Sequence, residues 1–159
     1  MLTLKIKRLS EDAILPVQST PGAGCWDVFA SSPPTVVSSE ELVLDKGEVF
    51  NSFRYIEYQT GLSFELPKGY DMLIFPRSSI SNTDLFLANG VGYLDNDYRG
   101  ELRFRFRTLQ PDKILKNFYG KGERIGQIRL IERNEFDILE VDSLSETKRG
   151  DGGFGSTGK

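Results

Sequence analysis

Short stretches in which apolar and polar residues alternate recur along the whole chain. The clearest is Glu101–Arg107, where charged and apolar side chains alternate without a break. Such alternation is typical of a β-strand with one face buried. Several strands of this kind in one chain predict an all-β domain of the sandwich or barrel class. The other strand candidates are Leu2–Leu9, Leu62–Leu66, Met72–Phe75, Ile125–Ile131 and Phe136–Val141.

Turns containing glycine, proline or aspartate separate the strand candidates, and one segment between them favours a helix. Pro76–Ser79 places serines at cap positions before Ile80–Leu87, which predicts one short helix there. Asn51–Tyr58 shows no regular period and is predicted as a surface loop or an added hairpin. Together these patterns predict an all-β, distorted jelly-roll or barrel-like domain with one short helix.

The chain has 159 residues, a length that suits one domain with its own core. We expect residues 1–148 to form that domain. Residues 149–159 are rich in glycine and polar residues, and we expect them to form a mobile tail. No apolar run approaches the roughly 18 residues that a membrane helix needs. The single cysteine, Cys25, excludes an internal disulfide and fits a reducing cytoplasm, that of the host if the chain is viral.

Charge and histidine content narrow the chemistry. A net charge of −3 argues against broad binding to a nucleic-acid backbone, which normally shows as a basic surface. Histidine is absent, so the commonest general base and the commonest zinc ligand are missing. Acid–base chemistry therefore falls to Asp, Glu, Lys, Tyr or the one cysteine.

The C-terminal tail combines glycines with donors that suit an anion. Its glycines let backbone N–H groups converge on a phosphate, and Arg149, Ser156 and Thr157 add side-chain donors. Phe154 is an aromatic residue in a segment without a core, which suits stacking on a base. A disordered polar tail explains the same composition.

A second segment, Pro76–Ser81, places Arg77, Ser78 and Ser79 at a predicted helix start. Free N–H groups at a helix start favour a phosphate. A simple capped turn fits the same residues.

A third segment, Asn89–Gly100, looks like a β-hairpin with a glycine-rich approach and an acidic turn. Asp95 and Asp97 in that turn are either turn formers or a general base with a group that orients it. Two weaker segments are Gly22–Ala30, in which Asp27 stands among small and aromatic residues, and Gly122–Ile128, a turn that enters a strand.

In type and order, these five segments resemble the five motifs of the homotrimeric dUTP diphosphatases, or dUTPases. The resemblance runs from about Pro21 to Lys159 and is most specific in Gly92–Gly100 and Arg149–Gly158. It implies hydrolysis of dUTP to dUMP and pyrophosphate by attack of water on the α-phosphorus. That reaction limits uracil incorporation into DNA and supplies dUMP.

The resemblance also implies a role for individual positions. Asp95 matches the aspartate that activates the water, and Asp27 matches the aspartate that supports the metal-bound phosphates without binding the metal. In this family Mg²⁺ is held mainly by the triphosphate and by water. Tyr98 matches the tyrosine that packs under the deoxyribose, and Asn89 belongs to the hairpin that reads uracil. The other implied substrate-binding positions are Arg77, Ser78, Ser79, Gly92, Gln127, Arg149, Phe154, Gly155, Ser156 and Thr157.

The family builds each site from three subunits, with the tail reaching over a neighbour, so the resemblance implies a homotrimer. The stretch of residues 47–58 is longer than in compact members and is expected to be a surface loop for a regulatory protein partner. Gly126 departs from the fourth motif, where alanine is common, and Cys25 stands where the first motif usually has glycine.

The nearest alternative is a dCTP deaminase, which shares the fold and the Arg77-Ser78-Ser79 segment. The deaminases lack the run Asp95–Tyr98 and the full glycine-rich tail. They use a catalytic glutamate on the strand after the third motif; Glu101 is charged there, but its register looks wrong.

Overall fold

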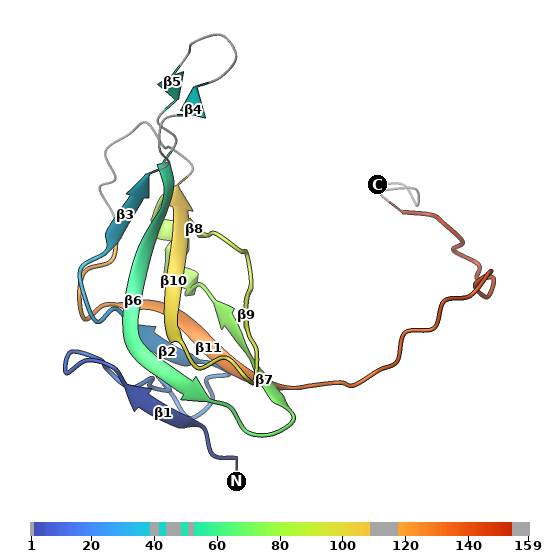
Figure 1. Cartoon of the computed structure of the whole chain (residues 1–159), viewed down its shortest axis with the longest axis horizontal. Coiled ribbons are helices and arrows are strands. Elements are labelled where there is room, and N and C mark those ends of the chain that lie inside the picture. The colour runs from blue at the N-terminus through green and yellow to red at the C-terminus, as the bar shows by residue number, and fades with distance from the viewer. Residues whose placement is uncertain (1, 39–41, 44–48, 51–52, 109–117, 154–159) are drawn as a thin grey trace.

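The computed structural model describes residues 2–38, 42–43, 49–50, 53–108 and 118–153. Across these residues the chain folds into two larger antiparallel sheets around one apolar core and a separate two-stranded ribbon (Figure 1). This is the all-β, jelly-roll-like fold that the alternating pattern predicts. None of the described helices is long and apolar enough to cross a membrane.

One long strand, β6 (Phe53–Glu65), organises the five-stranded sheet. One of its edges pairs with β10 (Glu101–Thr108), which in turn pairs with β8 (Leu85–Leu87). β1 (Lys5–Arg8) and β3 (Thr35–Ser38) also pair with β6, at opposite ends of its length.

The four-stranded sheet carries three of the predicted motifs. Its order is β2 (Trp26–Phe29), β11 (Arg124–Glu132), β7 (Tyr70–Phe75) and β9 (Gly92–Leu94). A separate two-stranded ribbon pairs β4 (Leu42–Val43) with β5 (Val49–Phe50) and projects beyond the sheets (Figure 1).

Strand alternation places the core. Along β10, Leu102, Phe104 and Phe106 are buried, while the arginines between them are exposed. Phe104 and Phe106 stack with ring centroids 6.3 Å apart. The other sheet contributes Met72 and Ile128, both buried in the same cluster.

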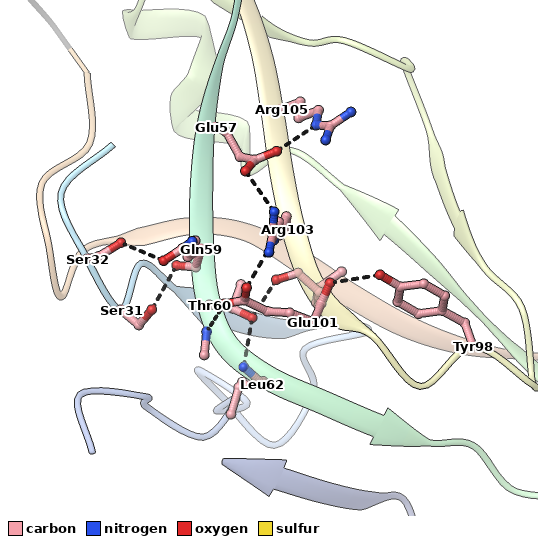
Figure 2. Close-up of polar contacts among 12 residues, drawn as sticks. Ser31, Ser32, Glu57, Gln59, Thr60, Leu62, Tyr98, Glu101, Arg103 and Arg105 are labelled. Carbon is pink, nitrogen blue, oxygen red and sulfur yellow. Dashed lines mark hydrogen bonds and ion pairs between the residues drawn. The ribbon is translucent and has the colours of Figure 1, made fainter. Parts of the chain in front are cut away.

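A bulge bends β6 in its middle. Gly61 has φ +64°, a left-handed conformation that glycine adopts without a Cβ clash. The hydroxyl of Thr60 donates to the carbonyl of Leu102 at 2.6 Å and accepts from the N–H of Leu62 at 3.2 Å (Figure 2). The threonine side chain thus replaces ladder hydrogen bonds where the register between β6 and β10 shifts.

The predicted helix is wrong in type and extent. The chain forms a short 3₁₀-helix, η1, at Ser78–Asn82, and Leu85–Leu87 is strand β8. Thr83 is already extended, and Leu85 and Leu87 point into the core while Phe86 faces out. A period of two, rather than of three or four, therefore governs the second half of this segment.

The third motif is not a hairpin. β9 pairs with β7 in one sheet, whereas β10 pairs with β6 and β8 in the other. Residues 95–100 therefore cross between the two sheets.

The predicted loop at Asn51–Tyr58 is also wrong where the structure describes it. Residues 53–58 form the first part of β6, and Ile56 and Tyr58 are buried. Residues 44–48 and 51–52 lie outside the described residues. The expected 47–58 insertion is therefore partly a core strand.

The strand predicted at Phe136–Val141 does not form. After β11 the chain continues as an extended segment, residues 133–153, which leaves the sheets (Figure 1). Phe136 is 80% exposed and Ile138 90% exposed. The apolar pattern there is real, but no strand among the described residues pairs with it.

Candidate active site

Asp27 is the centre of a polar cluster at one edge of the four-stranded sheet. It lies on β2, is 1% exposed, and faces the side chains of two other predicted motifs. Gln127 of β11 donates to Asp27 Oδ1 at 3.0 Å, and Arg77 Nε lies 3.2 Å from the same oxygen. Register explains the first contact, because Asp27 and Gln127 are direct partners in the β2–β11 ladder.

Two further groups hold the second carboxylate oxygen of Asp27. Ser19 donates its hydroxyl to Oδ2 at 2.6 Å, and Arg124 Nη1 lies 3.1 Å from that oxygen. Burial raises the pKa of Asp27, but the hydrogen bonds from Ser19 and Gln127 and the charges of Arg77 and Arg124 together lower it below its ordinary value. The carboxylate is therefore ionised and fixed, and two guanidinium groups outweigh its charge.

The second motif is placed by the end of β7. Strand β7 ends at Phe75, the chain turns into η1 after Arg77, and Arg77 thereby reaches Asp27. Arg77 Nη1 also donates to the hydroxyl of Ser79 at 3.4 Å. Ser78 is exposed at the start of η1. Sequence reasoning thus named Asp27, Arg77, Ser79 and Gln127 separately, and the fold brings them together.

Asp95 lies elsewhere on the single chain. It is exposed in the turn after β9 and lines a cavity of about 510 Å³ with five other polar residues. Among the described residues, no hydrogen bond or ion pair joins Asp95 to the Asp27 cluster. The cavity is lined by Asp71, Tyr93, Asp95, Asn96, Asp97 and Arg133.

Tyr98 lies in the segment of residues 95–100 that crosses between the two sheets. Its hydroxyl donates to the carbonyl of Glu101 at 3.2 Å (Figure 2). Its ring lies over Gly100, where a Cβ would collide with the tyrosine hydroxyl and ring. Glycine at position 100 is therefore needed for this ring position.

Asn89 and Gly92 lie next to each other before the turn. A Cβ at Gly92 would come within 2.9 Å of Ile74 Cβ and 3.0 Å of Asn89 Nδ2, so glycine leaves room for the Asn89 amide. Asn89 also lines a cavity of about 370 Å³, together with Tyr55 and the arginines of β10.

The tail is described only at its beginning. Arg149 Nε donates to the carbonyl of Gly152 at 2.8 Å within a local turn. Phe154, Gly155, Ser156 and Thr157 lie outside the described residues.

Known proteins resemble the chain throughout its length. A family model described as dUTPase matches residues 41–158. A deoxyuridine 5'-triphosphate nucleotidohydrolase of Hydrogenobaculum sp. is 35% identical over 158 residues, which are 99% of each chain. The protein of that name in Nautilia profundicola is 35% identical over 159 residues, covering 99% of this chain and 100% of the relative.

This chain belongs to the dUTPase family.

Solved dUTPases share its fold. The Staphylococcus bacteriophage 80alpha dUTPase with dUPNHPP aligns with a TM-score of 0.73 at 24% identity, over 99% of each chain. A dUTPase of phage phi11 of S. aureus, whose structure shows a species-specific insert, aligns with a TM-score of 0.66 at 18% identity. That match covers 91% of this chain and 99% of the phage protein.

In this dUTPase-family chain, Glu101 makes structural contacts between β6 and β10. Its Oε1 accepts from the N–H of Gly61 at 2.8 Å in the bulge, and its Oε2 accepts from Arg103 at 3.0 Å (Figure 2). Arg103 and Arg105 both reach Glu57 on β6. These contacts give Glu101 a role in joining β6 to β10, which disfavours the deaminase alternative.

Sequence reasoning missed several polar groups at the two sites. Arg124 stood inside the fourth motif, and its charge was the available signal. Ser19 gave none, because it reaches Asp27 only through the bridge that pairs Val17 with Asp27. Asp71 and Arg133 gave no signal either. The alternation of apolar and polar residues within β7 and β11 does not reveal that these two strands pair.

Proposed function

We propose that this chain hydrolyses dUTP to dUMP and pyrophosphate, with Asp95 as the general base. The observation that carries the proposal is the cluster in which Arg77, Asp27 and Gln127 unite three motifs of a dUTPase-family chain. Hydrolysis of dUTP limits uracil incorporation into DNA and supplies dUMP. A cytoplasmic setting, that of a host cell for a viral chain, belongs to the same proposal.

The chemistry needs one base and a fixed triphosphate. Asp95 accepts a proton from water, the water oxygen attacks the α-phosphorus, and the bond from that phosphorus to the pyrophosphate oxygen breaks. A carboxylate can serve as a general base, and Asp95 presents one at the wall of the cavity. Arg77 and Arg124 offer two positive charges against the one negative charge of Asp27, which suits phosphate binding.

We assign specificity for dUTP to Tyr98 in the crossing segment, to residues 89–92 and to the tail. The ring of Tyr98 would lie under the deoxyribose and leave no room for a 2′-hydroxyl. Backbone groups between Asn89 and Gly92 would read the edge of uracil. Phe154 would cap the base. Ser78, Ser79 and Gln127, together with Arg149, Gly155, Ser156 and Thr157 of the tail, would contact the phosphates. The ordered tail would also exclude bulk water and fix the triphosphate for attack.

Mg²⁺ is part of the proposal. A mutant dUTPase of phage phi11 with a similar fold is described as coordinating a structural Mg(II) ion. The donor set around Asp27 fits an ion that the substrate carries, because both oxygens of this carboxylate are already engaged by protein donors. Magnesium commonly sits on nucleotide phosphates and keeps several waters. Bound there, it would spread the negative charge that develops on the phosphates.

We also propose that the active species is a homotrimer. Asp27 and Asp95 belong to separate clusters on one chain, which supports a site shared between copies. The exposed apolar side chains of residues 133–153, such as Phe136, Ile138 and Leu139, are surface that association would cover. Light scattering after size exclusion at micromolar concentration tests this; an active monomer would refute it.

Phosphorus NMR of the purified protein with Mg²⁺ tests the reaction. We expect pyrophosphate from dUTP and none from dCTP, UTP or dTTP. Asp95→Asn should abolish the signal, whereas Asp12→Asn, at an exposed residue paired with Lys121, should leave it unchanged. Removal of Mg²⁺ with EDTA should suppress hydrolysis, and added Mg²⁺ should restore it. Intact dUTP with the wild type would refute the proposal.

A regulatory protein partner is a second function, favoured by the projecting β4–β5 ribbon (Figure 1). We place the partner surface there rather than on residues 53–58, which belong to β6 and bury Ile56 and Tyr58. Replacing residues 42–50 by a short glycine linker should leave hydrolysis intact and abolish partner capture. Capture that survives this replacement would refute the ribbon's role.

A further inference from the structure

The cavity beside Asp95 contains a set of contacts that the proposed chemistry does not use. Asp71 lies on β7 at its inner wall and is 3% exposed. Its Oδ2 accepts from the hydroxyl of Tyr93 at 2.7 Å and from Arg133 Nε at 3.0 Å. Its Oδ1 accepts from Arg133 Nη2 at 3.0 Å and from the N–H of Asn96 at 3.1 Å.

We infer that Asp71, Tyr93 and Arg133 form a positioning network that holds Asp95 for catalysis. The inference rests on the proposed function, in which Asp95 is the base. It goes further by assigning a role to Asp71 and Arg133, which lie outside the five motifs, and to Tyr93, which lies in the third motif but has no implied role. Asp71 makes no proposed contact with substrate; it acts through the turn that bears Asp95.

The network holds the chain by hydrogen bonds on both sides of Asp95. Tyr93 stands two residues before Asp95 and Asn96 directly after it, and both donate to the one carboxylate of Asp71. Asn96 adds a second anchor, because its amide donates to the carbonyls of Pro67 and Tyr70, both at 2.8 Å. The backbone of Asp95 is thereby fixed between two attachment points on one buried acid.

The carboxylate of Asp95 is left available for water. It makes no hydrogen bond or ion pair with the other described residues. Asp71, by contrast, is saturated by four donors, and Arg133 binds it through two parallel N–H groups, the geometry of a strong and directional ion pair. Asp71 is held in place by its donors, whereas the carboxylate of Asp95 remains available to accept a proton. A positioned general base requires this arrangement.

Arg133 also marks the point where the chain leaves the sheet. It follows the last residue of β11, and its N–H donates to the carbonyl of Gly69 at 2.8 Å. Arg133 therefore fixes the turn that bears Asp95 through its side chain and the start of residues 133–153 through its backbone. Movement of that extended segment would be transmitted to Asp71.

The exposure of Tyr93 allows its positioning role to be tested separately from fold stability. Tyr93 is 53% exposed, so removing its hydroxyl leaves the ring in place and opens no cavity. The side chain of Arg133 is 40% exposed, but its partner Asp71 is only 5% exposed, so Arg133→Gln leaves a buried carboxylate without its counter-charge and should also weaken the fold. Loss of the Tyr93 hydroxyl should therefore move the turn more than it weakens the fold.

Steady-state hydrolysis of dUTP by the full chain tests the network. Tyr93→Phe and Arg133→Gln should each lower kcat by roughly 10- to 100-fold, the loss typical of a misplaced catalytic group. KM for dUTP should stay within about two-fold, because the phosphate cluster around Asp27 is untouched. The double variant should lose far less than the product of the two single losses, since both act through Asp71.

Tyr70→Phe is the matched control. Its backbone carbonyl, which accepts from Asn96, is unchanged, and its hydroxyl makes no hydrogen bond among the described residues. It should behave as wild type. Should Arg133→Gln fail to fold, Tyr93→Phe decides alone.

Two results would overturn the network: kcat within two-fold of wild type in Tyr93→Phe, or a loss of kcat matched by an equal rise in KM and a lower unfolding temperature. Asp95→Asn measured in parallel separates this failure from that of the proposed function. A dead Asp95→Asn beside a normal Tyr93→Phe refutes the network alone. An active Asp95→Asn, or an inactive wild type, refutes the assignment of the base and the network with it.

Discussion

Gly126 is the position at which the smallest change should have the clearest effect. It lies on β11 beneath the ring of Phe104. A Cβ there would overlap Cε1 of that ring and would lie 2.6 Å from Cζ and 2.8 Å from Cδ1. Phe104 is 1% exposed and stacks against Phe106, so the ring has no solvent to move into. Alanine is common at this place in the fourth motif, and the Phe104 ring explains why glycine stands here.

We predict that Gly126→Ala lowers the free energy of unfolding by about 1–3 kcal/mol, the usual cost of overpacking a core. For a chain of 159 residues, this corresponds to a fall of roughly 2–12 °C in the unfolding midpoint. Circular dichroism at a fixed protein concentration measures it. Gly22→Ala is the control, because a Cβ at Gly22 has no neighbour within 4 Å.

A compensating change identifies the cause. Phe104→Leu alone should destabilise by leaving space where the ring was. Combined with Gly126→Ala, it should cost less than the sum of the two single changes by at least about 1 kcal/mol, because the new methyl occupies that space. Additive losses, or a Gly126→Ala protein as stable as Gly22→Ala, would refute the steric explanation.

Three other changes test the bulge and the buried acids. Thr60→Val should cost about 1–3 kcal/mol in urea unfolding, because it leaves the buried Leu102 carbonyl without its donor, while Thr60→Ser should stay near wild type. Gly61→Ala should destabilise the protein more than Gly69→Ala. Both glycines have positive φ, but only at Gly61 would a Cβ meet other atoms, at 2.7 Å from Ser10 Oγ. Equal losses of stability would show that backbone strain alone matters. The pKa of Asp71 is lowered by the hydrogen bond from Tyr93 and by Arg133, and that of Asp27 is lowered as well. The unfolded chain therefore takes up protons first as pH falls below about 4, and stability that is present above that pH should be lost as pH drops through the folded pKa values. Asp71→Asn should flatten this acid slope in urea unfolding between pH 3 and 6, and an unchanged slope would contradict it.

The sequence predicted those strands whose two faces differ in polarity. β10 was predicted almost to the residue, because its buried phenylalanines alternate with exposed arginines. The first part of β6 was missed because Tyr55, on its outer face, is aromatic and hides the period. That ring is accounted for only by tertiary structure, since Arg105 of β10 lies 4.6 Å from its centroid. The strand predicted at Phe136–Val141 is wrong for the opposite reason: its pattern is apolar, but no strand in the described part of the chain pairs with it.

The candidate site also contains residues that the sequence indicated and residues that it did not. Asp27, Arg77 and Gln127 are about fifty residues apart in sequence, and only the resemblance to a family linked them before the fold did. Asp71 and Arg133 belong to no motif. Their contact depends on β7 and β11 being neighbours, with Asp71 opposite Ile131 and Arg133 just past the end of the ladder. Local pattern carries no information about that pairing.

The order of strands in the four-stranded sheet also affects folding during synthesis. β2 has its strand partner in β11, about a hundred residues later in the chain. At roughly 5–20 residues per second on the ribosome, β2 waits about 5–20 s before its partner emerges. The Asp27 cluster therefore cannot assemble on a growing chain until β11 has been made. Pauses in translation after residue 108 would lengthen the time in which unpaired strand edges are open to association with other chains.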